Sequence, residues 1–569
     1  MGSHVWRVDV GGQTFLQEEV PEAWQRLGGR ALLARILLDE VPGGCDPLGR
    51  HNKLIWAPGL LGGQRLTSCD RISIGAKSPL TGGIKESNAG GTTAYALSCL
   101  GIHALILEGM PAQAGLWLLY LDGNGVRFER ADDLQGLGAY ATAKILIERF
   151  GSKVGISLIG PSGERGAHAA GILNLDKEGD PSRISARGGL GAVMGSKGVK
   201  AIVIDAANVE RPAVADPGRY KQAKKAFMAA LMAHPQIQAY ADYGTAAMTA
   251  MSDGFGGIPT RNFSSGVFEE AEAIGGDRMR ELLLARGGAA NTTHACMPGC
   301  VIRCSNCFAD AEGKKVVSPV EYETIGLLGS NLGIDDLDTV AQMNAALNDM
   351  GLDTIEIGAA LGVAAEAGFM TFGNRGEALA LVDQIRTATP LGRVLEQGAQ
   401  MTGTVFNIRR VPVVKGQALS AYDPRAIKGT GVTYATSPQG ADHTAGLTIR
   451  AKINHLDPKG QAELSRAAQI NMAGYDSLGA CIFAGFGFGT VPETLREILY
   501  GQYGWDPGES VLQDLGRECL RMERAFNTAA GMGPEDDRLP EWMEEEPLPP
   551  HNTVFDVPDD ELDRIFEGL

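Results

Sequence analysis

The chain has 569 residues, roughly four domains of average size, so its length predicts several domains or one large enzyme. Hydrophobic residues make up 44% and charged residues 21%, which excludes general disorder. The net charge of −17 disfavours a nucleic-acid-binding protein, because such a protein needs a basic face for phosphates.

Residues 1–205 contain many short segments typical of β-strands, with a few helical patterns between them. The predicted strands are Val5–Val10, Leu54–Pro58, Arg71–Gly75, Ala104–Glu108, Leu116–Leu121, Val126–Glu129, Val154–Ile159 and Ala201–Ile204. The predicted helices between them are Trp24–Leu38, Thr92–Leu100 and Ala139–Phe150. Beyond a composition shift near 205–217 the chain is mostly helical, with helices expected at 219–233, 320–332, 337–350, 355–366, 377–387, 460–472, 492–500 and 510–526. This order predicts an α+β fold.

Glycine is abundant, at 77 residues, without the three-residue period of collagen, which indicates many turns and loops that approach ligands closely. No apolar run reaches the roughly 18–20 residues that span a bilayer. The first residues lack the basic and then apolar pattern of a signal peptide. We therefore predict no membrane span and a cytoplasmic location.

Four of the nine cysteines, Cys296, Cys300, Cys304 and Cys307, lie close together in the sequence. In a cytoplasmic chain such thiols are poor disulfide candidates and good ligands for an iron–sulfur cluster. Zinc is an alternative, although structural zinc sites favour cysteine pairs with a longer spacer between them. The last three also match the radical-SAM spacing. In that class the triad normally follows the first strand of a partial β/α barrel, whereas here it comes after about 295 residues with no alternating strand–helix pattern behind it. Cys481 stands alone in a glycine-rich segment, and the remaining cysteines are predicted to be small buried residues.

A glycine-rich loop and a pair of similar short segments are further candidates for ligand binding. Glycines in Arg187–Lys197 let backbone N–H groups approach phosphates, but their spacing and the lack of a preceding strand disfavour a dinucleotide fingerprint. Asn348–Asp353 and Asp476–Cys481 share the frame D/N-x-x-G-x-D/C. This frame suits a helix end that curls around a ligand, with an ordinary helix C-cap as the alternative. The second segment makes Cys481 a candidate remote ligand of the cluster.

Taken in order, these segments resemble the aldehyde:ferredoxin oxidoreductase family, whose members carry tungsten or molybdenum on a bis-pterin cofactor. The resemblance covers essentially the whole chain. Its segments are Lys77–Gly82, Glu86–Gly91, Arg187–Lys197, the cysteine cluster, Glu321–Thr324, Gly351–Asp353, Ala435–His443, Asp476–Cys481 and Glu535–Pro540.

The resemblance implies a β-rich cofactor-binding domain at 1–207, a helical domain with the cysteine cluster at 208–415, and a second helical domain with an acidic tail at 416–569. It places Arg71 between the pterin and a [4Fe–4S] cluster. Asn88 and the loop of Arg187, Gly188, Gly189 and Gly191 are implied to face the pterin phosphates and a bridging Mg²⁺. The implied groups at the pterin edges are Asn348, Asp353 and Asp476. The expected cluster ligands are Cys296, Cys300, Cys304 and Cys481, with Cys307 as a substitute.

The sequence also departs from the family pattern. The family spaces its cysteines as C-x2-C-x3-C, whereas Cys296, Cys300 and Cys304 are each separated by three residues. Asn348 replaces the usual first Asp of its segment. No histidine has a glutamate three residues before it, so the inter-subunit iron site of some members is not expected.

The activity implied by the resemblance is oxidation of an aldehyde with water to a carboxylate. Glu323 is expected to activate water or accept a proton, and His443 to polarise the carbonyl oxygen. Two electrons would leave singly through the cluster to ferredoxin or to a ferredoxin-like small subunit. The alternatives are reduction of an aromatic acyl thioester within a larger complex, radical-SAM chemistry and a non-catalytic iron–sulfur electron-transfer subunit. The choice between tungsten and molybdenum, the aldehyde and the oligomeric state are left open.

Overall fold

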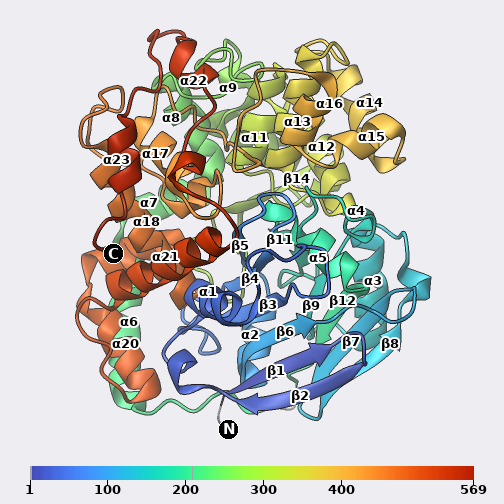
Figure 1. Cartoon of the computed structure of the whole chain (residues 1–569), viewed down its shortest axis with the longest axis vertical. Helices are drawn as coiled ribbons and strands as arrows, with labels where there is room; N and C mark the ends of the chain where they lie inside the picture. The colour runs from blue at the N-terminus through green and yellow to red at the C-terminus, as the bar shows by residue number, and fades with distance from the viewer. Residues whose placement is uncertain (1–2, 208) are drawn as a thin grey trace.

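The structure is a computed structural model that describes residues 3–207 and 209–569. Two six-stranded sheets form the first third of the chain, at the lower right of Figure 1. The first contains β1 (His4–Asp9), β2 (Thr14–Glu19), β3 (Leu54–Pro58), β4 (Ile72–Lys77), β5 (Ile84–Ala89) and β6 (Ile102–Glu108). The second contains β7 (Trp117–Asp122), β8 (Gly125–Arg130), β9 (Gly155–Leu158), β10 (Ile172–Asn174), β11 (Arg183–Ser185) and β12 (Val199–Ile204).

The two sheets repeat one topology. The first has the strand order β2-β1-β6-β3-β4-β5, and the second, read from its far edge, has the order β8-β7-β12-β9-β10-β11. In each sheet one pair is parallel, β1 with β6 and β12 with β7, and the other neighbours are antiparallel. The sequence analysis found no such repeat, because topology is preserved here without a recognisable repeat of residues.

Helices pack on these sheets and link them to the rest of the chain. Those in the first domain are α1 (Gly29–Glu40), α2 (Thr93–Cys99), α3 (Ala139–Phe150), the short α4 (Pro161–Glu164) and α5 (Leu190–Ser196). Helix α1 contacts β3 and β4 on one side and the later helices α18 (Gln461–Leu478) and α21 (Val511–Ala529) on the other. Leu32, Leu33 and Ile36 of α1 are fully buried in this contact, so the apolar face of one helix joins the first domain to the last.

The remainder of the chain is mainly helical, which confirms the α+β prediction. The helices that bear on the site are α6 (Pro217–Ala233), α11 (Tyr322–Leu328), α12 (Leu337–Met350), α13 (Thr354–Glu366), α17 (Lys428–Thr436) and α20 (Glu493–Tyr503). The predicted helix at 320–332 is shorter than expected. Glu321 has an extended backbone (φ −99°, ψ 163°), so α11 begins after it, and Gly329 separates α11 from the short 3₁₀ helix Ser330–Leu332.

Further differences concern short elements and the domain boundary. The sequence analysis missed β2, β5, β10 and β11, and the expected helix Trp24–Leu38 begins only at Gly29. The predicted boundary at residue 208 lies outside the described residues.

The acidic tail is more firmly docked than its composition indicates, because Trp542, Met543 and Leu548 are buried. In the described part of the chain, no helix is both long and apolar enough to cross a membrane.

Candidate active site

Glu323 and His443, which are remote in sequence, meet where the helical region faces the sheets. His443 Nε2 lies 3.3 Å from Glu323 Oε1, and its Nδ1 lies 2.9 Å from Ser420 Oγ. The other carboxylate oxygen of Glu323 accepts a 2.7 Å hydrogen bond from the Ala421 backbone N–H. Because both side chains are mostly buried and held from two elements each, they form a preorganised acid–base pair.

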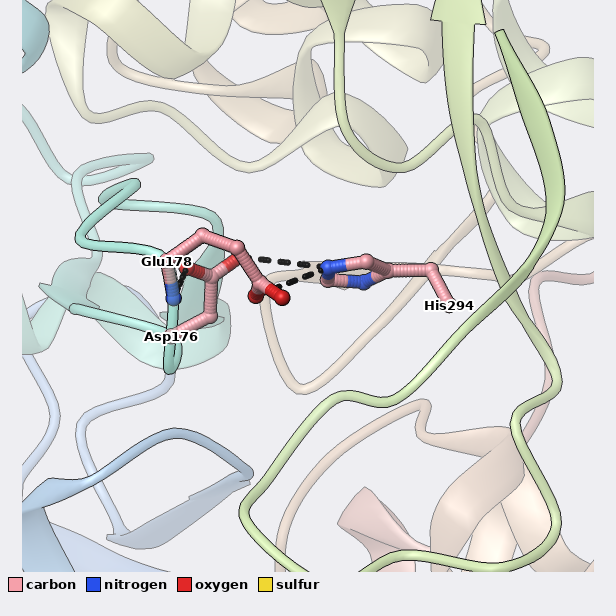
Figure 2. Close-up of side chains that lie close together, drawn as sticks. All are labelled: Asp176, Glu178 and His294. Carbon is pink, nitrogen blue, oxygen red and sulfur yellow. Dashed lines mark hydrogen bonds and ion pairs between the residues drawn. The ribbon is translucent and has the colours of Figure 1, made fainter. Parts of the chain in front are cut away.

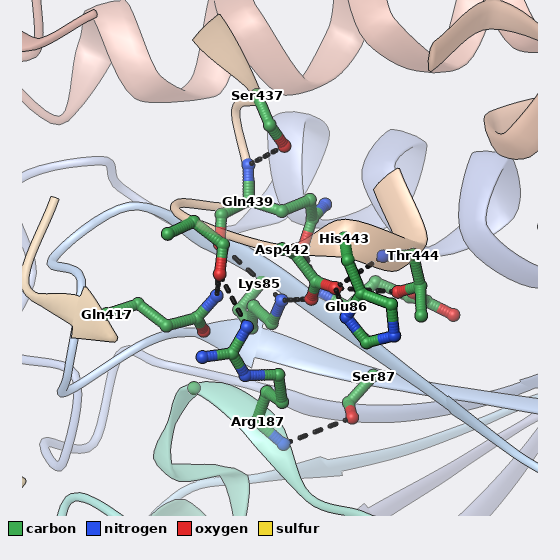
Figure 3. Close-up of polar contacts among 12 residues, drawn as sticks. Lys85, Glu86, Ser87, Arg187, Gln417, Ser437, Gln439, Asp442, His443 and Thr444 are labelled. Atoms are coloured by element: carbon green, nitrogen blue, oxygen red, sulfur yellow. Dashed lines mark hydrogen bonds and ion pairs between the residues drawn. The ribbon is translucent and has the colours of Figure 1, made fainter. Parts of the chain in front are cut away.

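Behind His443 lies a buried ion pair that the sequence analysis missed (Figure 3). Lys85 Nζ on β5 lies 2.7 Å from Asp442 Oδ2, and the Lys85 side chain is fully buried. Asp442 also accepts from the Thr444 backbone N–H at 3.0 Å, which fixes the turn that carries His443. Burial opposes ionisation, but Lys85 and Arg187 outweigh it and hold the pKa of Asp442 well below its usual range.

This ion pair gives a stability prediction. In Asp442→Asn the Lys85 ammonium stays buried without a counter-charge, and we expect a loss of about 3–5 kcal/mol of stability. The folded pKa of Asp442 is depressed, so the pair stabilises fully above the usual Asp pKa of about 3.9 and is lost only as pH falls below it. The deficit of Asp442→Asn in urea unfolding should therefore be constant between about pH 5 and 8. A variant as stable as the wild type would contradict the pair's role, and adding Lys85→Met should recover part of the loss.

Arg187 connects the glycine loop to the segment that carries Ser420 and His443. Its guanidinium donates to the carbonyl oxygens of Ala418 and Ala441, and its Nε lies 3.3 Å from Asp353 Oδ2. The Arg187 guanidinium thus bonds to groups of the protein itself. The part of the glycine loop that can still bind a ligand is its backbone. Gly188 and Gly189 have φ values of 81° and 73°, and a side chain at either would meet Lys85 or Pro79, so close packing accounts for both.

The two similar short segments end two helices in the same way. Helix α12 ends at Gly351 (φ 76°) and α18 ends at Gly479 (φ 72°), which are left-handed C-caps. Gly351 lies against Gly160 after β9, and Gly479 against Gly59 after β3, so closely that a side chain on Gly59 or Gly160 would clash with backbone. The two helix ends therefore occupy equivalent places on the two repeated sheets. Asn348 is buried, and Asp353 caps α13 by accepting from the Ile355 N–H at 3.0 Å.

A buried acidic cluster surrounds Asp476. Arg30 makes two hydrogen bonds to Glu523, at 2.7 and 2.9 Å, and its Nη1 lies 3.3 Å from Asp476 Oδ2. Burial and then the Glu86 charge raise the pKa of Asp476 to about 8. Glu86 Oε1 is buried with no hydrogen-bond partner among the described residues. Glu86 thus has a free acceptor oxygen and lies beside a second carboxyl group, Asp476. Carboxyl groups placed in this way can bind N–H donors of a ligand. Only Asp476 was predicted, although Glu86 begins one of the family-like segments.

Arg71 lies close to both this acidic cluster and the cysteines. It donates to Asn88 through Nε and, at 3.1 Å, through Nη2 to the Asn88 carbonyl oxygen. Burial opposes its charge, but Cys481, Cys296 and Asp476 raise the pKa of Arg71. The guanidinium is therefore close to groups of both sites.

The structure brings Cys296, Cys300, Cys304 and Cys481 together and leaves Cys307 apart. Cys300 is the largest cause of the raised pKa of Cys296, and after burial Cys481 and Cys300 contribute to the raised pKa of Cys304. In the part of the chain described, no three of these sulfurs lie within 4.8 Å of one another. A zinc ion, with Zn–S near 2.3 Å, would hold all its sulfurs roughly 3.8 Å apart, so these cysteines are not arranged as a closed zinc site.

Neighbouring residues hold the two cysteine segments together. The Cys481 N–H donates to the Ser68 carbonyl oxygen at 2.8 Å, and Ser68 Oγ lies 3.5 Å from Cys300 Sγ. Ser68 and Cys69, which is also buried nearby, were not predicted to lie here. Cys307 is on the strand β14 (Ser305–Ala309), where burial, Asp176 and Glu178 raise its pKa.

A third group of side chains lies beside the cysteine loop (Figure 2). His294 Nε2 is 3.0 Å from Glu178 Oε2 and 4.0 Å from Asp176 Oδ2. Arg183 Nη2 lies 3.0 Å from His294 Nδ1 and 3.9 Å from Asp176. The Arg183 guanidinium provides a positive charge next to the Asp176 and Glu178 carboxylates, as a bound metal ion would. We therefore interpret these residues as an ion network that holds the cysteine loop against β11.

Comparison with known proteins agrees with this architecture. The model of the aldehyde ferredoxin oxidoreductase N-terminal domain matches residues 5–206, and that of its domains 2 and 3 matches residues 222–567. The tungsten-containing aldehyde ferredoxin oxidoreductase of Pyrococcus abyssi is 33% identical, over 94% of this chain and 90% of its own length. The enzyme of the same name from Thermococcus kodakarensis is 32% identical, over 94% and 89%.

More distant proteins share the fold. An aliphatic sulfonate oxidoreductase, WOR-like subunit, from Pyrococcus furiosus is 24% identical over 92% of this chain and 85% of its own length. The solved active-site complex BamBC of benzoyl coenzyme A reductase superposes with a TM-score of 0.79 at 18% identity, covering 99% of this chain and 93% of that chain. The two family models span nearly the whole sequence, and the relatives from Pyrococcus abyssi and Thermococcus kodakarensis are 33% and 32% identical over most of it. The chain therefore belongs to the aldehyde ferredoxin oxidoreductase family.

Proposed function

We propose that this protein oxidises an aldehyde to a carboxylate at a tungsten or molybdenum bis-pterin cofactor, with electrons leaving through a [4Fe–4S] cluster. The observation that carries the proposal is the Glu323–His443 pair at 3.3 Å, in a chain that also ends two helices in equivalent places against its two repeated sheets. The relatives that are 32–33% identical carry the names of tungsten-containing aldehyde ferredoxin oxidoreductases, which supports this substrate class.

The residues present fit the proposed groups. Two equivalent helix ends suit two pterins, and Asp476 and the unpartnered Glu86 oxygen suit ring N–H donors. Asn88 and the backbone of the loop at Gly188 and Gly189 would face the phosphates and Mg²⁺. Four thiols gathered from two segments, and not arranged as a closed single-ion site, suit a [4Fe–4S] cluster. When bound, the cofactor supplies the two-electron chemistry and the sulfur ligands of its metal, so that no protein thiolate is needed there.

The protein's own contribution is to place the aldehyde and move protons. Glu323 Oε1 accepts no hydrogen bond from the described residues, although His443 Nε2 lies 3.3 Å away. This oxygen is therefore available to take a proton from water. His443, held by Ser420 and by the turn at Asp442, can donate a hydrogen bond to the carbonyl oxygen. Buried surroundings strengthen both interactions.

Two of the alternative functions are disfavoured by the geometry. Radical-SAM chemistry needs the triad of Cys300, Cys304 and Cys307, but the Cys307 thiol is perturbed by Asp176 and Glu178 and not by the other cysteines. A simple electron-transfer subunit leaves the Glu323–His443 pair and the paired helix ends without a purpose. The alternative of thioester reduction is represented among the similar structures by the benzoyl coenzyme A reductase complex. At 18% identity this likeness supports the fold alone.

Cofactor content tests the proposal. The purified protein is expected to contain about one tungsten or molybdenum, two pterins and about four irons per chain, measured by metal analysis and by pterin fluorescence after denaturation. Iron without pterin would contradict the proposal and favour an electron-transfer subunit. Aldehyde-dependent reduction of a viologen dye, compared with acyl-thioester-dependent oxidation of the reduced dye, then decides the direction of the reaction.

A further inference from the structure

We infer that a cationic patch formed by Arg65, Arg211 and Lys224 is the docking surface for an acidic electron-carrying protein. The inference rests on the proposed function, because it names the place where electrons leave the cluster. It starts from an unusual arrangement of charge. None of the three cations makes an ion pair within 4.0 Å in the part of the chain that the structure describes.

The three positive charges are held close together. The guanidinium groups of Arg65 and Arg211 lie 4.7 and 5.9 Å from the centre of the same Tyr95 ring. Lys224 Nζ donates to the Arg65 carbonyl oxygen at 2.9 Å. A carboxylate behind them, Asp70, is buried, accepts from the Gly63 N–H at 2.7 Å and carries a single negative charge against three positive ones. Like charges gathered in this way repel one another, and an external anionic surface would relieve that repulsion.

The charge of this patch is opposite in sign to the net charge of the molecule. The chain has 68 acidic and 51 basic residues, and surface arginines elsewhere, such as Arg409, Arg496 and Arg538, pair with carboxylates. An acidic partner is therefore repelled over most of the surface and attracted here, which steers it to one orientation. The same net charge opposes binding of a nucleic acid, which carries far more charge over a far larger surface.

A short stretch of backbone joins the patch to the cysteines. Arg65 is three residues before Ser68, and three residues of extended chain span at most about 11 Å. Ser68 in turn accepts from the Cys481 N–H at 2.8 Å and places its hydroxyl 3.5 Å from Cys300 Sγ. A protein bound over Arg65 thus lies next to the proposed cluster ligands.

Apolar side chains lie beside the cysteines. Ile482 directly follows Cys481 and is 40% exposed, and Val301 is half-buried with its N–H bonded to Thr67 Oγ1 at 3.1 Å. Protein interfaces commonly combine a small apolar centre with a charged rim. The residues near the cysteines offer both parts, whereas a site for a small anion would need no exposed isoleucine.

The test uses the double variant Arg65→Gln/Arg211→Gln in the loaded enzyme. An acidic bacterial ferredoxin and benzyl viologen serve in turn as electron acceptors at low ionic strength. We expect the second-order rate of ferredoxin reduction to fall at least 10-fold and to lose most of its salt dependence. Turnover with the small cationic dye should stay within twofold of the wild type, because the dye needs no docking surface.

The matched control is Lys144→Gln/Lys153→Gln. It removes two exposed charges that also lack ion pairs in the described residues, from α3 and the loop after it, at the right of Figure 1, whereas α6 with Lys224 lies at the lower left. The inference is overturned if the control loses as much ferredoxin reduction as the patch variant, or if the patch variant loses none. Equal loss with both acceptors also overturns it, because the defect would then lie in the site.

Binding separates this inference from the proposed function. Calorimetry of oxidised ferredoxin with the protein requires no substrate, and the patch variant is expected to bind at least 10-fold more weakly than the wild type. If aldehyde turnover is absent but this difference is present, the docking surface stands and the proposed reaction fails. If coenzyme A at constant ionic strength displaces the ferredoxin, the patch is a small-anion site and the inference fails.

Discussion

Replacing Glu323 by Gln, or His443 by Asn, is expected to lower aldehyde turnover with a viologen dye by at least about 100-fold. A positioned general acid or base contributes roughly 10²–10⁴-fold to a rate. Gln keeps the shape of Glu323, Asn keeps a polar group near the place of His443 Nδ1, and both substitutions remove the proton chemistry. The Glu323–His443 contact at 3.3 Å leaves each group next to its partner, so the loss should come from chemistry and not from collapse of the site. Metal and pterin content should be unchanged in both variants.

Glu321→Gln is the matched control. Glu321 precedes α11 and accepts from Thr245 Oγ1, on the side of the chain that faces Cys304, so it is half-buried and is directed away from His443. A glutamine can keep the hydrogen bond, and we expect a much smaller loss of turnover. If Glu321→Gln abolishes turnover while Glu323→Gln is near normal, the assignment of the acid–base residue is wrong. If all three variants remain active, the protons move without these side chains.

The second large effect is expected at the cluster. In Cys481→Ser the fourth thiolate is replaced by a poorer ligand, so the EPR signal of the dithionite-reduced protein should be lost or converted to that of a three-iron cluster. The backbone bond from the residue at 481 to Ser68 survives the change, which keeps the segment in place.

Cys519→Ser provides the comparison, since Cys519 is also fully buried but lies 3.6 Å from Glu523 in the acidic cluster. Its iron content and EPR spectrum should match those of the wild type. An unchanged spectrum in Cys481→Ser would mean that the fourth ligand lies elsewhere. Cys69, which is buried beside the same thiols, would then be tested before the more distant Cys307.

The sequence predicted the parts of the fold that are encoded locally. Strands such as β3 and helices such as α12 have clear apolar periodicity and bounded ends, so their positions were nearly correct. The edge strands β2 and β11 were missed because they are short and largely polar or loop-like in sequence. Their existence depends on pairing with a neighbour, which local pattern does not reveal.

The candidate site shows the same division. The cysteine cluster was found from its spacing, and Glu323 and His443 were found because they belong to segments that resemble a family. Lys85 and Asp442 were missed although they form a 2.7 Å buried pair, since their contact joins a strand to a loop far along the chain. Arg30 and Glu523 were missed for the same reason, because nothing near either residue in the sequence indicates its partner.

The repeated sheets give the first domain an approximate two-fold relation, typical of a duplicated ancestral unit, and the departures from it set a direction. The helix ends at Gly351 and Gly479 are equivalent, yet the next polar position is Asp353 in one copy and Cys481 in the other. Under the proposed function, one pterin therefore has a carboxylate at its edge and the other has the route to the cluster. Only the segment that ends at Cys481 offers a thiolate to the proposed cluster, so under the proposed function electrons would leave from the Gly479 side of the site and not from the Gly351 side.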